Sequence, residues 1–327
     1  MLNVLLVTFP FFALVLAGYL AAQRRMLPLE AIPGLNGFVL FFALPCMLYR
    51  FGSTTPIADL LDASVAGVYL LCGLVMVGVC IAITMNQRIR WNDASLGALV
   101  AAFPNSGFMG VPLLVALLGP AAAGPTILTM LLDMVVISSL CVALSRLDSD
   151  GDSGEGGQGG GARAMLVAGR KALRGVVGNP MPWAILLGAA ASAAQFALPG
   201  PVQTTVWLLA DAASPVALFT IGAVLARSQI QANHPMPLAD YVPVALMKLL
   251  LHPLLVLGVG TVAIRLGVPL DPFALTVMVL VAALPSASNV SLLAERLGAD
   301  NGRIARIILV TTVAAFFTFS GAVALLT

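Results

Sequence analysis

Charged residues are scarce in this sequence. Only 9% of its 327 residues are Asp, Glu, Lys or Arg, and 60% are hydrophobic. A soluble domain of this size normally carries about a quarter charged residues. The deficit excludes a soluble globular protein and predicts an all-α polytopic membrane protein that sits in a lipid bilayer. The formal net charge of +2 gives no indication of a nucleic-acid partner, and we expect none.

Cysteine is also rare. The four cysteines, Cys46, Cys72, Cys80 and Cys141, all fall in apolar segments without a C-x-x-C spacing. Such positions are typical of small core residues, so we expect no metal site, redox site or bound cofactor.

The motifs of common membrane enzymes and pumps are absent from the sequence. It contains no H-E-x-x-H, no G-x-S-x-G and no P-loop, which argues against hydrolysis and ATP-driven transport. Asp133 and Asp211 could suggest an intramembrane aspartyl protease, but LLDM and LADA stand where such enzymes have YD and GxGD motifs. We therefore expect a protein that is not an enzyme.

Long hydrophobic runs dominate what is present. A transmembrane helix needs about 20 predominantly apolar residues. With turn residues as boundaries, we expect ten spans, at 2–22, 34–52, 62–85, 94–119, 124–146, 178–198, 201–226, 239–265, 272–297 and 303–326.

The basic residues support this count. Ten spans place thirteen of the sixteen Lys and Arg residues on one face: Arg24, Arg25, Arg88, Arg90, Arg146, Arg163, Arg170, Lys171, Arg174, Arg227, Arg296, Arg303 and Arg306. Basic residues collect on the cytoplasmic side of a membrane. We therefore expect both termini outside and the central loop in the cytoplasm, in a multi-pass protein of a bacterial inner membrane.

The central loop separates two similar halves. Residues 148–177 include the glycine-rich stretch DSDGDSGEGGQGGG, which is typical of a flexible tether, although a regulatory segment is the alternative. The loop divides the chain into a first five-helix repeat at 1–147 and a second at 178–327.

The two halves share proline and glycine positions. At an offset of 170 residues, Pro10 matches Pro180, Gly18 matches Gly188, Pro45 matches Pro215 and Gly52 matches Gly222. At an offset of 181, AAFP (101–104) matches AALP (282–285). Related halves with an odd number of spans insert in opposite orientations, and such inverted repeats are characteristic of alternating-access transporters.

Two equivalent spans are interrupted, at Pro104 and at Pro285. Proline breaks a helix, and freed backbone groups survive in a membrane only inside protein or beside a cavity. Polar residues follow both breaks: Asn105, Ser106 and Gly107 after the first, and Ser286, Ser288 and Asn289 after the second. Helix N-termini that meet at such breaks would favour an anion, and the Asn and Ser side chains could add hydrogen bonds to it. The alternative is that both breaks are packing kinks.

The sequence also resembles a known family. PNSGFMGVPLL (104–114), KLLLHPLL (248–255) and LPSASNVSLLAERLGAD (284–300) are similar to motifs of the auxin efflux carriers, which include bacterial permeases for malonate, malate and other small carboxylates. The crossover pattern is shared loosely with the bile-acid:sodium symporter fold. The resemblance implies a scaffold of spans 1, 2, 6 and 7, and a transport domain of spans 3–5 and 8–10 that moves as an elevator. It implies substrate contact at the crossover, and we expect this contact at Asn105, Ser106, Gly107, Ser286, Ser288 and Asn289. It is also compatible with a homodimer. The short central loop departs from the long-loop plant exporters.

Four residues of the Asp, Lys and His types lie well inside expected spans, where charge is costly and marks functional candidates. Asp133 could bind H⁺ or Na⁺ as a coupling residue, or bridge two helices. Lys248 could hold a substrate carboxylate, or pair with a buried aspartate or with helix C-terminal carbonyls. His252 shares a helix face with Lys248 at a spacing of four residues and is either a packing residue or a proton shuttle. Asp211 we expect to be structural.

Together these features predict a secondary transporter of small organic anions, either mono- or dicarboxylates. An anion channel would also use broken helices, and a membrane sensor of the same fold would bind ligand without accumulating it. Saturable flux and counterflow separate these alternatives.

Overall fold

The structure, a computed structural model, describes residues 2–55, 62–146, 180–230 and 236–327. In these residues all regular structure is helical, apart from one isolated bridge between Pro104 and Ser286. The all-α class is confirmed for the described part of the chain. The expected tether at 148–177 lies outside it.

Helices of the first half are α1 (Leu2–Gln23), α2 (Ile32–Phe38), α3 (Leu44–Thr54), α5 (Ala63–Thr84), α6 (Trp91–Ala102), α7 (Val111–Leu118), α8 (Ala123–Leu132) and α9 (Ser138–Ser145). Those of the second half are α11 (Pro180–Ala193), α12 (Gly200–Ile230), α13 (Val242–Leu246), α14 (His252–Arg265), α15 (Pro272–Ala283), α16 (Asn289–Arg296) and α17 (Asn301–Leu326). Short π-helical segments join several of them: η2 (Val39–Ala43), η3 (Ser106–Gly110), η5 (Asp133–Ile137) and η7 (Met247–Leu251).

Seven helical segments of the described residues are long and apolar enough to cross a membrane: Val4–Gln23, Leu29–Thr54, Ala63–Thr84, Pro120–Ser145, Gly200–Ile230, Val242–Arg265 and Asn301–Leu326. They coincide with seven of the ten expected spans. The other three expected spans contain the shorter apolar helices Ser106–Leu118, Trp183–Ala193 and Pro272–Ala283. The molecule therefore has the architecture of a multi-pass membrane protein.

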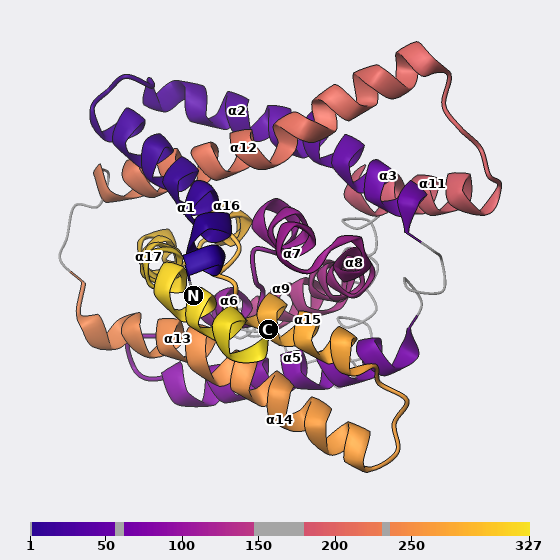
Figure 1. Ribbon diagram of the computed structural model, residues 1–327. Helices are drawn as coiled ribbons and strands as arrows, with labels where there is room; N and C mark the ends of the chain where they lie inside the picture. Colours follow the sequence, from indigo (N-terminus) through magenta and orange to yellow (C-terminus); the bar gives the residue numbers. More distant parts are fainter. Residues whose placement is uncertain (1, 56–61, 147–179, 231–235) are drawn as a thin grey trace, which may run out of the picture.

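The helices form two groups (Figure 1). In the first, α1 packs along α12 and α3 packs along α11, while α12 also contacts α2 and α3. In the second, α5 packs on α6 and α14, and α15 and α17 complete the group around the shorter helices. We call these the α1–α12 group and the α5–α17 group.

Glycines allow the close approach inside the α1–α12 group. A Cβ atom added to Gly18 would overlap the carbonyl oxygen of Phe219, and one added to Gly222 would overlap that of Val15. The second helix pair repeats this arrangement, because a Cβ on Gly188 would overlap the carbonyl oxygen of Tyr49. Each helix therefore lies against the backbone of its neighbour.

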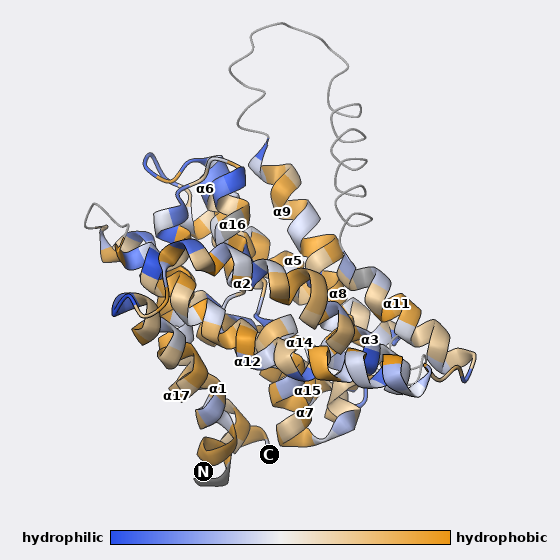
Figure 2. Ribbon diagram, turned by 90° about the horizontal axis from the view of Figure 1, so that it is seen from above, coloured by the Kyte–Doolittle hydropathy of each residue, from blue (hydrophilic) through white to orange (hydrophobic). Residues whose placement is uncertain are grey.

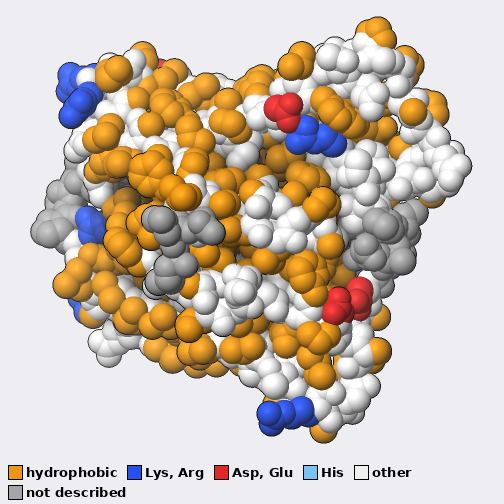
Figure 3. All heavy atoms as spheres, viewed as in Figure 1, with side chains coloured by type: hydrophobic (Ala, Val, Ile, Leu, Met, Phe, Trp, Pro, Cys, Tyr) orange, Lys and Arg blue, Asp and Glu red, His pale blue; other side chains and the backbone are white. Residues whose placement is uncertain are grey.

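The two termini lie at the same end of the molecule (Figure 2). Hydrophilic segments gather at the opposite end, around the start of α6. On the face that carries the termini, hydrophobic side chains dominate and charged ones are few (Figure 3).

Candidate functional site

Helices α6 and α15 both end two residues before the prolines expected to interrupt them. Helix α6 ends at Ala102, and α15 ends at Ala283. Residues 103–105 and 284–288 are not helical, and helical structure resumes at 106 and at 289. Both interruptions are therefore present in the structure.

The two interrupted segments pair with each other. The backbone N–H of Asn105 donates a hydrogen bond to the carbonyl oxygen of Pro285 at 2.8 Å, and the N–H of Ala287 donates to that of Phe103 at 3.0 Å. These bonds surround the antiparallel bridge between Pro104 and Ser286. We call this pairing, with the residues that follow each break, the crossing.

The crossing collects all six of the expected substrate-binding residues: Asn105, Ser106, Gly107, Ser286, Ser288 and Asn289. Asn105, Ser106 and Ser286 are buried, whereas the other three are partly exposed. The crossing therefore combines buried and accessible polar groups.

Hydrogen-bond donors remain available at the crossing. The N–H of Ser286 donates to the hydroxyl of Thr311 at 3.3 Å, but the buried Ser286 hydroxyl itself has no hydrogen-bond partner among the described residues. In addition, two helical segments start here, at Ser106 and Asn289, and helix N-termini carry partial positive charge. Some of their first N–H groups already have acceptors, since Ser106 donates to the carbonyl oxygen of Pro104 at 2.8 Å and Ser291 to that of Ser288 at 3.3 Å. The Ser286 hydroxyl and the two positive helix ends favour a ligand that accepts hydrogen bonds.

Asp133 belongs to a second polar cluster. It is fully buried at the start of η5, and the Tyr69 hydroxyl on α5 donates to its Oδ2 at 3.0 Å. Its Oδ1 has no hydrogen-bond partner in the described part of the chain. Burial of a carboxylate oxygen without a partner is costly, so this atom is a candidate for binding a proton or a cation.

Lys248 connects this second cluster to the crossing. It is fully buried, and its ammonium donates to the carbonyl oxygen of Ala282 at 2.8 Å, in the last turn of α15 before the break. It also lies 3.1 Å from Nδ1 of His252, which confirms that these two residues share a helix face. Of the alternatives for Lys248, the observed contact is the one with a helix C-terminal carbonyl.

His252 is fully buried beside Lys248. Its ring lies 6.1 Å from that of Tyr69, centroid to centroid, and its Nε2 atom has no hydrogen-bond partner among the described residues.

Asp211 does not belong to either cluster. It forms an ion pair with Arg50 at 2.6 Å on α12 and α3, in keeping with the structural role expected for it.

Three π-helical segments carry candidate residues: Ser106 and Gly107 in η3, Asp133 in η5 and Lys248 in η7. Wide turns of this kind are rare and occur frequently at functional sites. The sequence reasoning did not anticipate them, and it also missed Tyr69 and Thr311. Tyr69 could have been noticed, because it is the one tyrosine in the expected span 62–85.

A helical membrane protein with two interrupted spans paired at a polar centre belongs to the class of membrane transport proteins. The family described as "Membrane transport protein" matches residues 4–323 of this chain. A "Putative malonate transporter" of Rhizobium meliloti is 30% identical over 318 residues, which cover 95% of this chain and 92% of that protein. The "Uncharacterized transporter YfdV" of Escherichia coli is 24% identical over 292 residues, covering 88% and 86%. The chain therefore belongs to the auxin efflux carrier family of membrane transport proteins.

Proposed function

We propose that this protein is a secondary active transporter of small organic anions, either mono- or dicarboxylates, with the crossing as its substrate site. The main support is the pairing of two interrupted helices beside two helix starts and the Ser286 hydroxyl, which has no partner in the described part of the chain. A carboxylate would accept hydrogen bonds from these donors in place of water. The similarity to a protein described as a malonate transporter favours the same substrate class.

We further propose that the chain consists of two inverted five-helix repeats. The glycine contacts support this arrangement, because an offset of 170 residues exchanges them. The contact of Gly18 with Phe219 becomes that of Gly188 with Tyr49. Likewise, the contact of Gly222 with Val15 becomes that of Gly52 with Ile185. A pseudo-twofold axis in the membrane plane would relate the pairs in this way.

The same grouping suggests which part moves. The α1–α12 group, which holds expected spans 1, 2, 6 and 7, would be the static scaffold because its helices contact each other through backbone atoms. The α5–α17 group contains both interrupted helices and would carry the substrate across as an elevator. The two groups also make a polar contact near the crossing. The hydroxyl of Ser214 on α12 donates a hydrogen bond to the carbonyl oxygen of Phe108 in η3 at 3.3 Å.

Asp133 is our candidate for coupling to H⁺ or Na⁺. Its Oδ1 atom, which has no hydrogen-bond partner among the described residues, could take either cation, and Lys248 interacts with Asp133 electrostatically. Lys248 also binds the Ala282 carbonyl in the last turn of α15 before the break. A change in charge at Asp133 would therefore alter the position or strength of this Lys248–Ala282 hydrogen bond. We place the protein in a bacterial inner membrane with both termini outside, and a homodimer is compatible with a fixed scaffold.

Counterflow in proteoliposomes with a panel of mono- and dicarboxylates tests this function. We expect saturable exchange, and we expect Asn105→Ala and Asn289→Ala to raise the KM about tenfold or more, because each removes a hydrogen bond to a charged ligand. Gln23→Ala, which removes an exposed amide far from the crossing in sequence, is the control. Normal transport by both asparagine variants would show that the crossing is not the substrate site. Flux without saturation or counterflow would indicate a channel.

A further inference from the structure

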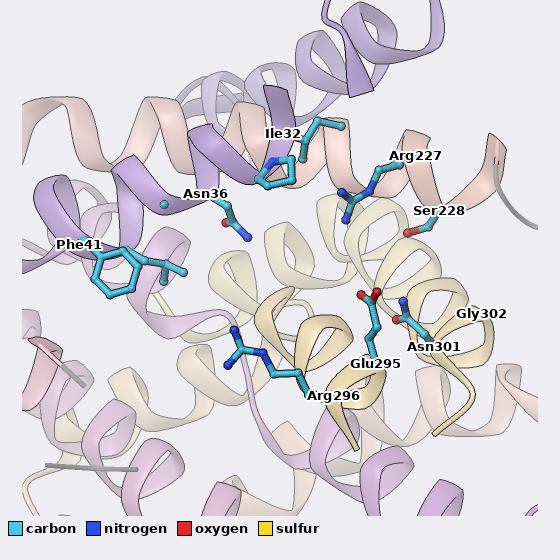
Figure 4. A pocket seen from close by; sticks show the side chains of 12 residues that line it. Ile32, Asn36, Phe41, Arg227, Ser228, Glu295, Arg296, Asn301 and Gly302 are labelled. Carbon is cyan, nitrogen blue, oxygen red and sulfur yellow. The ribbon is translucent and has the colours of Figure 1, made fainter. Parts of the chain in front are cut away.

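A cavity of about 600 Å³ lies between the two helix groups, at the end of the molecule opposite the termini (Figure 4). Binding sites for small molecules typically have volumes of about 300–1,000 Å³. Its polar lining comes from Asn36 on α2, Arg227 and Ser228 on α12, Glu295 and Arg296 on α16, and Asn301 on α17. None of these residues belongs to the crossing.

Two arginines extend into this cavity from opposite walls. Arg227 comes from the α1–α12 group and Arg296 from the α5–α17 group, as Figure 4 shows. Among the described residues, neither has a carboxylate within the 4.0 Å of an ion pair, since the two ion pairs there are Arg50–Asp211 and Arg88–Asp240. Guanidinium groups bind carboxylates through two parallel hydrogen bonds, so each arginine is free to take one.

The third charged residue of the cavity limits what it could hold. Glu295 also extends into the cavity and has no ion-pair partner among the described residues, so the three side chains together carry a net charge of +1. The positive balance favours an anion, and the carboxylate of Glu295 would weaken its binding. An anion with two carboxylates could contact both arginines.

An asparagine adds a hydrogen-bonding group to this lining. The Ser291 hydroxyl donates to Oδ1 of Asn301 at 2.8 Å, which fixes the Asn301 side chain and leaves its amide N–H groups as donors.

The cavity is also connected to the crossing through α16. Asn289 begins this helix and Glu295 lies six residues further on, which corresponds to about 9 Å along the axis.

We propose that this cavity is a docking site for a small dicarboxylate, in which Arg227 binds one carboxylate and Arg296 the other before the anion reaches the crossing. This inference rests on the proposed transport function and adds a second site to it. It favours dicarboxylates over monocarboxylates, because a single carboxylate occupies only one of the two arginines.

The test uses the full-length protein in inside-out membrane vesicles, where this end of the molecule would face the added substrate. Arg227→Gln and Arg296→Gln should each raise the KM for malonate and succinate about tenfold, through the loss of a charge-assisted pair. The KM for acetate should rise less than threefold. Glu295→Gln should lower the KM for both dicarboxylates, because it removes the repelling charge. Arg24→Gln, an equal change of charge at an exposed position on the same end, is the control and should leave the KM unchanged.

Several outcomes would overturn the docking site. One is that both arginine variants behave like Arg24→Gln, and another is that acetate and malonate are affected equally. Competition by inorganic phosphate as strong as that by malonate would point instead to a general anion site. If an arginine variant does not fold, Glu295→Gln decides alone, and an unchanged or higher KM refutes the proposal.

Failure of the proposed function would look different. If the wild-type protein transports no carboxylate, the transport assignment fails, and calorimetric titration of the purified protein with malonate then decides the docking site. Binding that Arg227→Gln and Arg296→Gln abolish would support the site, and binding that they leave unchanged, or no binding, would refute it.

Discussion

The glycine contacts of the α1–α12 group lead to a graded prediction. We expect Gly222→Ala to destabilise the protein, because the new methyl group would overlap the carbonyl oxygen of Val15 and lie 2.7 Å from the backbone nitrogen of Tyr19. These neighbours are backbone atoms, so a whole helix must shift to make room. Gly52→Ala should cost less, since its closest neighbour, the carbonyl oxygen of Ile185, lies at 2.8 Å.

The magnitude follows from two opposing effects. Adding a methyl group to a tightly packed site costs about 1–3 kcal/mol, and more where backbone must move, while alanine gains about 1 kcal/mol of helix propensity over glycine. At Gly222 we expect a net loss of about 2 kcal/mol, which lowers the Tm of a chain of this length by about 3 °C. Gly258 is the matched control, because it is also helical and a Cβ there would meet nothing within 4 Å.

Thermal unfolding of the purified variants in one detergent measures this series. The expected order of Tm is Gly258→Ala highest, then Gly52→Ala, then Gly222→Ala. If Gly222→Ala melted at the same temperature as Gly258→Ala, the close helix contact would be absent, and with it the main support for the inverted repeat.

Two further predictions concern the charged residues of the spans. Lys248→Met should strongly destabilise the protein, because it leaves the Ala282 carbonyl without its partner, whereas Asp133→Asn should be tolerated and should alter the dependence of transport on pH or Na⁺. Unchanged ion dependence in Asp133→Asn would contradict the coupling role. So would a double variant, Lys248→Met with Asp133→Asn, whose loss of stability equals the sum of the two single losses. At the Arg50–Asp211 pair, Arg50→Gln should lower the Tm more than Asp211→Asn, because a long arginine side chain can reach the membrane surface and an aspartate cannot. The reverse order in thermal unfolding would show that the pair is not exposed to lipid.

Much of this fold can be predicted from local sequence features. Apolar length gives the spans, and proline inside an apolar run gives the breaks, because both can be recognised within one continuous stretch of sequence. The interruptions at Pro104 and Pro285 are predictable for this reason, as is the shared helix face of Lys248 and His252.

The contacts between distant segments are not predictable in this way. Nothing local to Lys248 indicates that its ammonium meets the carbonyl of Ala282, 34 residues away. Likewise, Tyr69 and Asp133 are 64 residues apart, and their contact depends on how α5 packs. The cavity with Arg227 and Arg296 is a further example, because it exists only where two helix groups face each other.

The crossing also explains how this chain tolerates two broken helices inside a membrane. Each freed backbone group that lacks a partner in lipid costs several kcal/mol. Here the breaks satisfy each other, since Asn105 donates to Pro285 and Ala287 donates to Phe103. Side chains satisfy two more groups, as Thr311 accepts from the N–H of Ser286 and Lys248 donates to the carbonyl of Ala282. Some of the first N–H groups of the restarting segments also have backbone acceptors, since Ser106 donates to Pro104 and Ser291 donates to Ser288. The Ser286 hydroxyl is then left without a partner among the described residues. The same geometry that stabilises the interruption therefore leaves a buried hydroxyl at the point where the two halves meet.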